Sequence, residues 1–134
     1  MVSSALSLQL EFYENMYKSR RFDERLWDAY TSGKLLGMTH LGIGEEAVGT
    51  GTMKAFRPED IVCPHHRSHA HQLMRGCDLK SLLSEDIAEG HRRVQGQSRR
   101  GPTLWMCPKT SMFSAARWVP CFTVPLGFAY NFKP

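Results

Sequence analysis

The sequence has few of the features that mark secreted, metal-clustered or membrane-spanning proteins. Its four cysteines include no C-x-x-C pair, so neither a zinc knuckle nor a thioredoxin-type motif is indicated. The opening segment, Met1 to Leu10, contains no lysine or arginine and so lacks the basic start of a signal peptide. The longest uncharged run, Trp118 to Phe132, is interrupted by prolines and is short for a membrane span. We therefore expect a cytoplasmic chain with reduced thiols and no membrane partner.

Composition and charge are those of an ordinary globular domain. At 134 residues the chain fits one domain, and 42% apolar with 22% charged residues argues against disorder along the whole length. The net charge of +4 is unevenly spread, because Arg92, Arg93, Arg99 and Arg100 lie close together. Such a run is typical of a solvated loop or of a segment that binds an anionic partner. It contains no interleaved aromatic residues and no recognisable module, so nucleic-acid binding is not expected.

The first part of the chain predicts one long helix. Apolar residues recur there at close to helical spacing, which favours a helix over about 7–31. Ser32-Gly33 follows, and glycine can take the left-handed conformation that ends a helix. The pair Arg20-Arg21 is expected to face solvent or to form ion pairs with Asp23 and Glu24.

Shorter elements are predicted further along the chain. We expect helices over 45–56, 68–74 and 79–89, the last with Asp78 as its N-cap. A short strand is expected over 60–63, bounded by a proline. Helices that alternate with a strand favour an α/β class.

Glycines punctuate these shorter helices. Gly49 and Gly51 weaken the second helix by roughly 1 kcal/mol each relative to alanine, and close packing against another backbone is the usual reason to keep such residues. Gly76 and Gly90 are expected to end the third and fourth helices.

Four histidines lie close together and raise the possibility of a metal site. They are His65, His66, His69 and His71. His65 and His69 have the spacing of ligands on one helical face, but the predicted helix begins only near Ser68, so His65 should lie outside it. No Cys, Asp or Glu inside the cluster completes a familiar zinc set. Metal binding is kept only as an alternative.

Arg67 and His40 are better placed for other chemistry. Arg67 lies between the predicted strand and helix, where unpaired backbone N–H groups and a guanidinium can hold a phosphate. A salt bridge is the alternative role for this arginine. His40 lies in a glycine-rich loop before an acidic helix start. It is a candidate acid or base near pH 7, and the alternative is a surface histidine without such a role.

Several short motifs follow one another between Glu11 and Glu89. They are Arg21-Phe22-Asp23-Glu24-Arg25, His40-Leu41-Gly42-Ile43-Gly44-Glu45-Glu46-Ala47, Arg57-Pro58-Glu59-Asp60, His66-Arg67-Ser68-His69-Ala70-His71 and Arg75-Gly76. Each motif is weak alone. In this order they resemble the opening of the E1 α subunits of thiamine-diphosphate-dependent 2-oxoacid dehydrogenases of the pyruvate, branched-chain and acetoin types.

This resemblance implies a fold, an activity and a cofactor. The fold would be the N-terminal part of a thiamine-diphosphate-binding fold, helix-rich with a partial parallel sheet. The activity would be that of an oxidoreductase, which decarboxylates a 2-oxo acid and transfers the acyl unit to a lipoyl group on an acyltransferase. Thiamine diphosphate and Mg²⁺ would bind at the interface with an E1 β subunit. By the match, Arg67 and His66 bind the cofactor diphosphate. His69, near the thiazolium ring, and His40, which lines the site, are the implied catalytic residues.

The chain departs from the family pattern in its second part. His66 stands where the family has a tyrosine, the tail over 90–134 diverges, and the family's Gly-Asp-Gly and downstream Asn for Mg²⁺ are not present. We therefore expect a single incomplete E1 α-type domain over 1–134, family-like to about residue 89, that is truncated and weakly active or inactive alone. The alternative is a non-catalytic α/β module that binds an anion or a partner.

Overall fold

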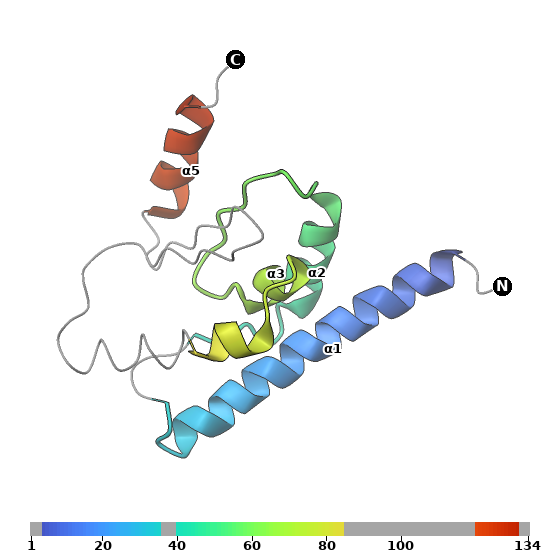
Figure 1. Ribbon diagram of the computed structural model, residues 1–134, viewed down its shortest axis with the longest axis vertical. Helices are drawn as coiled ribbons and strands as arrows, with labels where there is room; N and C mark the ends of the chain where they lie inside the picture. The colour runs from blue at the N-terminus through green and yellow to red at the C-terminus, as the bar shows by residue number, and fades with distance from the viewer. Residues whose placement is uncertain (1–3, 36–39, 85–119, 132–134) are drawn as a thin grey trace.

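Three helices pack against one another and form the centre of the structure. The computed structural model describes residues 4–35, 40–84 and 120–131. Its helices are α1 (Ser4–Thr31), α2 (Glu46–Ala55), α3 (His69–Met74) and α5 (Pro120–Asn131), and residues 79–84 are also helical. Helices α1, α2 and α3 all contact one another, with α2 and α3 on the same side of the long α1 (Figure 1). None of the described helices is long and apolar enough to cross a membrane.

Helix α1 buries one stripe of side chains in its second half. The stripe has the i, i+3, i+4, i+7 spacing of one helical face and consists of Ser19, Phe22, Asp23 and Leu26. Phe22 and Leu26 form an apolar cluster with two leucines from later segments, Leu35 and Leu82. Asp23 is fully buried beside them, so its carboxylate needs partners from elsewhere in the fold.

The predicted helix ends agree with the structure wherever the chain is described. Gly33 has a φ of +72° just after α1, and Gly76 has a φ of +82° just after α3. Asp78 accepts hydrogen bonds from the backbone N–H groups of Lys80 and Ser81, both at 3.1 Å, which confirms it as an N-cap. Residues 85–89 of the predicted fourth helix, Gly90 and the arginine run lie outside the described residues.

The predicted strand over 60–63 is not formed in the structure. Only Val62 makes an isolated bridge there, and no continuous strand occurs in the described residues. The segment instead holds Val62 in a second small apolar cluster with Met53, against Met74. Four residues closed off by Pro64 leave little length for a ladder of hydrogen bonds, so the segment is used for packing. The described part is therefore helical, and the expected partial parallel sheet is not seen there.

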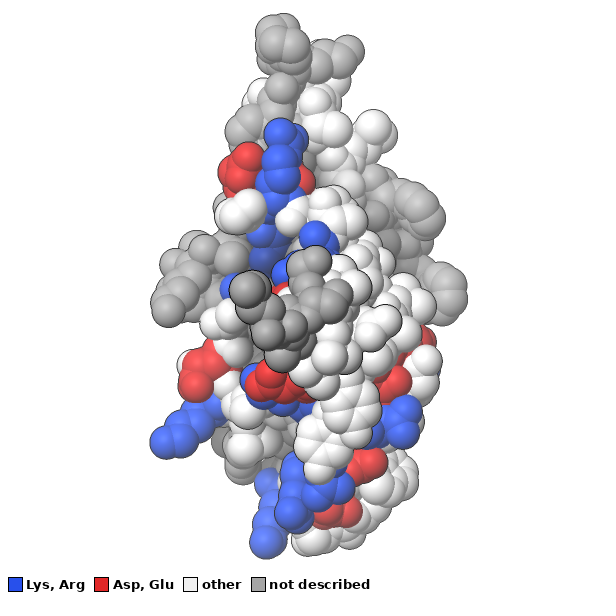
Figure 2. All heavy atoms as spheres, turned by 90° about the vertical axis from the view of Figure 1, so that its right-hand side faces the viewer, with Lys and Arg blue, Asp and Glu red and all other residues white. Residues whose placement is uncertain are grey.

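Surface charges are arranged in short-range pairs of opposite sign. Lys18 pairs with Glu14 on α1, and Lys54 of α2 reaches Glu11 of α1 at 2.6 Å. On the face shown in Figure 2, basic and acidic side chains are interspersed. Such exposed pairs contribute little to stability, typically about 0–1 kcal/mol each.

The two glycines of α2 have different surroundings. A Cβ built on Gly49 would lie 2.6 Å from the Cβ of Ala70 on α3, which is closer than real Cβ atoms approach. Gly49 therefore lets α2 and α3 pack closely, as expected from the sequence. A Cβ on Gly51 would meet nothing within 4 Å, so the close-packing explanation is wrong for this residue.

This contrast gives a matched pair of substitutions. Gly49→Ala should lower the free energy of unfolding by about 1–3 kcal/mol, because α2 and α3 must separate to fit the methyl group. Gly51→Ala should raise it by roughly 0.5–1 kcal/mol, because alanine favours the helix and the site has space. Urea unfolding of both variants measures the two values. Equal effects of the two substitutions would contradict the packing of α3 on Gly49.

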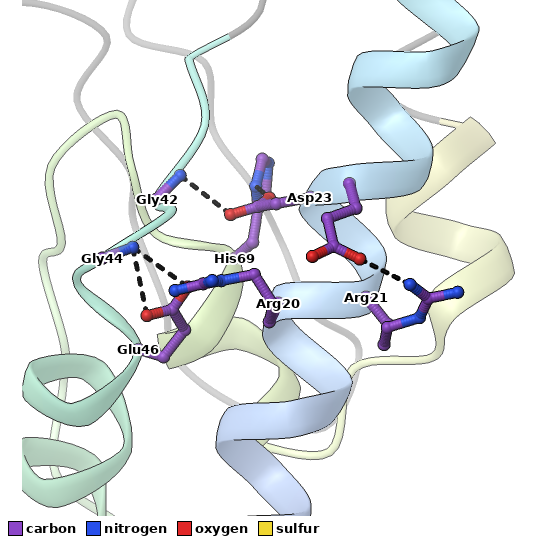
Figure 3. A network of polar contacts seen from close by, with 8 residues as sticks. Arg20, Arg21, Asp23, Gly42, Gly44, Glu46 and His69 are labelled. Carbon is purple, nitrogen blue, oxygen red and sulfur yellow. Dashed lines mark hydrogen bonds and ion pairs between the residues drawn. The ribbon is translucent and has the colours of Figure 1, made fainter.

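A second link between α1 and α2 is an ion pair that is partly shielded from solvent. Arg20 Nε lies 2.5 Å from Glu46 Oε1, and the Glu46 residue is buried (Figure 3). The hydrogen bond from Arg20 outweighs the effect of burial and lowers the pKa of Glu46 from 4.5 to about 2. The expected ion pair of an arginine with Glu24 is confirmed, because Arg21 binds Glu24 at 2.6 Å. The expected ion pair with Asp23 is not formed, because Arg20 binds Glu46 instead.

The lowered pKa of Glu46 predicts a pH-dependent stability. The folded-state pKa of about 2 lies below the ordinary 4.5. The contribution of the ionised Glu46 to the free energy of unfolding is therefore complete above about pH 4.5 and is lost as the pH falls toward 2. Glu46→Gln should lower the free energy of unfolding by about 1–2 kcal/mol at pH 7, after discounting for the half-exposed Arg20, and by progressively less at lower pH.

Urea unfolding at several pH values between 3 and 7 checks this prediction. The control is Glu59→Gln, which removes an exposed carboxylate whose ion-pair contact, with Arg57 Nε, is long at 3.8 Å, and which should leave the pH profile close to that of the original chain. A Glu46→Gln deficit that stays constant from pH 7 to pH 3 would show that the ion pair is not the cause.

Candidate functional site

The loop that precedes α2 is held at three backbone positions. The N–H of Gly42 donates to Asp23 Oδ2 at 2.8 Å, and the N–H of Gly44 donates to both carboxylate oxygens of Glu46 at 3.0 and 3.1 Å (Figure 3). The carbonyl of Leu41 accepts a hydrogen bond from Arg67 Nη1 at 2.8 Å. The segment from His40 to Glu45 is therefore fixed by side chains from α1, from α2 and from the segment before α3.

Asp23 joins this loop to α3. Its second oxygen, Oδ1, lies 2.6 Å from Nδ1 of His69, the first residue of α3. Both residues are buried, with Asp23 at 0% and His69 at 5% exposure. The ring of Phe22 packs edge-on against the His69 ring, with centroids 5.2 Å apart. One carboxylate thus connects α1, the glycine loop and α3.

Four histidine rings lie in a row beside the loop. The ring centroids of His40 and His66 are 4.6 Å apart, those of His66 and His65 are 5.6 Å apart, and those of His65 and His71 are 6.1 Å apart. His65 Nε2 also lies 3.7 Å from Glu45 Oε2. The fold thus brings His40, predicted as a separate candidate, into contact with His66 of the histidine-rich segment.

Burial keeps two of these rings neutral near pH 7. It lowers the pKa of His66, and the nearby His40, His65 and Arg67 lower it further. The pKa of His71 is lowered first by burial and then by His65. A neutral imidazole has one donor and one acceptor nitrogen, so His66 can donate a hydrogen bond to a ligand oxygen without being charged.

The row of histidines does not support the alternative metal site. As expected, His65 lies outside α3, whose first residue is His69. His69 turns instead to Asp23 in the interior. No group of three or more His, Cys, Asp or Glu side chains in the described parts of the chain is arranged to hold a metal ion.

Arg67 is exposed beside the histidines, but its setting differs from the sequence argument. Helix α3 has only six residues, and Ser68 and His69 at its start are 2% and 5% exposed. The helix start is therefore not open to an anion, and any anion site depends on the Arg67 side chain. Within the described residues Arg67 forms no ion pair, and its side-chain hydrogen bond to the Leu41 carbonyl uses only Nη1 of the guanidinium.

The sequence argument missed the two carboxylates that position the site. Asp23 and Glu46 were seen as motif or helix-start residues, and their hydrogen bonds to the loop were not foreseen. A signal was available for Asp23, because it lies on the same helical face as Phe22 and Leu26. An acidic residue on a buried face needs a partner, although the sequence does not show which one.

Comparisons with known proteins place the chain in a family. Residues 14–130 match the model of the family described as dehydrogenase E1 component. The pyruvate dehydrogenase E1 component subunit alpha of Zymomonas mobilis is 35% identical over 130 residues, which cover 92% of this chain and 36% of that protein. The alpha subunit of acetoin:2,6-dichlorophenolindophenol oxidoreductase from Bacillus subtilis is 34% identical over 88 residues, covering 66% of this chain and 26% of that protein.

The chain spans about a third or less of the length of these relatives. No solved structure matches the chain. The family match extends over most of the chain and includes every residue of the candidate site, from Arg20 to His71. The chain therefore belongs to the dehydrogenase E1 component family.

Proposed function

We propose that this chain contributes part of a thiamine diphosphate site to an E1 α-type 2-oxoacid dehydrogenase. The observation that carries the proposal is the meeting of Arg67, His66 and His40 on one side of the glycine loop. Arg67 binds the loop carbonyl of Leu41, and the His40 and His66 rings are 4.6 Å apart. Membership of the dehydrogenase E1 component family, and the names of the relatives, support the choice of reaction.

The described residues fit the diphosphate end of this cofactor. Phosphate oxygens favour guanidinium groups, which offer several N–H donors in one plane. Arg67 is exposed and donates one hydrogen bond to Leu41 through Nη1, so its guanidinium has further N–H donors to offer a ligand. The neutral ring of His66 adds a hydrogen-bond donor close by, in place of the tyrosine that the family has there.

In this proposal each residue has a separate task. Thiamine diphosphate, when bound, supplies the carbon nucleophile and the electron sink for decarboxylation. Arg67 and His66 hold the diphosphate, and His40 on the loop lines the site beside them. We assign His69, oriented by Asp23, to the thiazolium end. Mg²⁺, an E1 β subunit and a lipoyl acyltransferase remain parts of the proposal that derive from the family.

A titration with thiamine diphosphate tests the proposal. The purified chain, with and without a cognate E1 β subunit, is titrated by calorimetry in the presence of Mg²⁺. Arg67→Ala should weaken binding by about 10- to 100-fold, because one charge-assisted hydrogen-bond donor contributes roughly 1.5–3 kcal/mol. The matched control is Arg25→Ala, which removes an exposed arginine from α1 and should leave the affinity unchanged.

Two results would overturn the assignment. Equal affinity in the original chain and in Arg67→Ala would remove Arg67 from the cofactor site. No binding of thiamine diphosphate by the folded chain, with or without the β subunit, would reject the cofactor. Binding of inorganic pyrophosphate but not of thiamine diphosphate would instead favour the alternative, a non-catalytic module that binds anions.

A further inference from the structure

The carboxylate of Asp23 contacts two different parts of the candidate site. Oδ2 accepts from the N–H of Gly42, and Oδ1 faces Nδ1 of His69. The carboxylate is fully buried, so both oxygens depend on protein partners for hydrogen bonds. Asp23 itself lies on α1, and no ring of the row of histidines is among its two partners.

The contact with His69 determines where the ring holds its proton. His69 Nδ1 and Asp23 Oδ1 are 2.6 Å apart, which is a hydrogen-bond distance. An ionised carboxylate can only accept hydrogen bonds, so Nδ1 must carry the hydrogen atom. In a neutral ring this makes Nε2 the basic nitrogen. The edge-on contact with Phe22 adds a steric limit to rotation of the same ring.

We propose that Asp23 is a positioning residue, which holds His69 with its proton on Nδ1 and at the same time holds the loop that carries His40. The inference rests on the proposed function, since it assigns Asp23 a role toward two residues of the proposed cofactor site. A carboxylate behind a functional histidine commonly fixes both the orientation and the tautomer of the ring. Here the same carboxylate also fixes a glycine amide, so the histidine and the loop are positioned together.

Asparagine at this position separates the two tasks. The Asn side chain has one acceptor oxygen and one donor NH₂ group, so it cannot accept from both Gly42 and His69. The Gly42 N–H can only donate, whereas the His69 ring can exchange tautomers. We therefore expect the oxygen of Asp23→Asn to remain with Gly42 and the NH₂ group to face Nδ1 of His69, which moves the ring proton to Nε2.

The experiment combines nuclear magnetic resonance with kinetics on the full chain. Long-range ¹H–¹⁵N spectra of the histidine rings report the tautomer, and His69→Gln assigns the His69 signals. The original chain should show a protonated Nδ1 at His69, and Asp23→Asn should show the proton on Nε2. Asp28→Asn, an exposed change of the same type on α1, should leave the spectrum unchanged.

The kinetic readout separates positioning from a purely structural role. With a cognate β subunit, Asp23→Asn should change thiamine diphosphate affinity less than about threefold but lower kcat for 2-oxo acid decarboxylation at least about 100-fold. The reason is that a proton on Nε2 leaves His69 without a basic nitrogen on the side away from Asp23. A kcat close to that of the original chain would overturn the positioning role, and so would an unchanged tautomer in the variant.

The first spectrum keeps the inference testable even if Asp23→Asn does not fold. A His69 ring in the original chain with its proton on Nε2 and a bare Nδ1 would overturn the proposal without any variant. Failure of the proposed function has a different signature, because the original chain would then neither bind thiamine diphosphate nor turn over substrate. The His69 spectrum would still show whether Asp23 fixes the ring.

Discussion

The buried carboxylate of Asp23 is the contact on which the arrangement of the described fold depends. Removing an ionised carboxylate from water is costly by several kcal/mol unless it is paired and hydrogen-bonded. In this chain the necessary partners come from the glycine loop and from α3, which are distant from Asp23 in the sequence. Folding α1 against the rest of the chain therefore requires the loop and α3 to arrive at the same place.

A second carboxylate repeats this device from the other side of the loop. Glu46 lies in the first turn of α2, and both of its carboxylate oxygens accept a hydrogen bond from the N–H of Gly44. The same carboxylate also binds Arg20 of α1. In the part of the chain that the structure describes, the buried apolar residues form two small clusters, around Leu26 and around Met53. Polar contacts are therefore a large part of what places the loop. Polar networks of this kind specify one arrangement, because every alternative leaves a buried group unsatisfied.

The site is divided into a buried layer and an exposed layer. The buried layer consists of Asp23, Glu46 and His69, which bind one another, the glycine loop or α1. The exposed layer consists of Arg67 and His65. His66 lies between the two layers and has a lowered pKa for that reason. Such a division suits a ligand-binding site, because the inner residues fix the backbone and the outer ones stay accessible to a charged ligand.

Local features were predictable from the sequence because their causes are local. The long first helix follows from apolar periodicity, the ends at Gly33 and Gly76 follow from the freedom of glycine at positive φ, and the Asp78 cap follows from its hydrogen bonds to residues two and three positions later. The strand over 60–63 was wrongly predicted because strand formation depends on a neighbour that no local pattern supplies. Gly51 was misinterpreted for a similar reason, since only the position of α3 distinguishes it from Gly49.

By itself the sequence determined the approximate extents of α1, α2 and α3, and the order of motifs that resembles the E1 α family, whereas α5 was not predicted. It also singled out Arg67, His66, His40 and His69 as candidate residues. Only the tertiary structure decided the partners: Asp23 with His69 rather than with an arginine, Arg20 with Glu46, and Arg67 with the Leu41 carbonyl. The physical reason is that a buried charge must be satisfied by whichever groups the fold brings within hydrogen-bond distance. Those groups are set by the packing of α1, α2 and α3, which no spacing along the chain records.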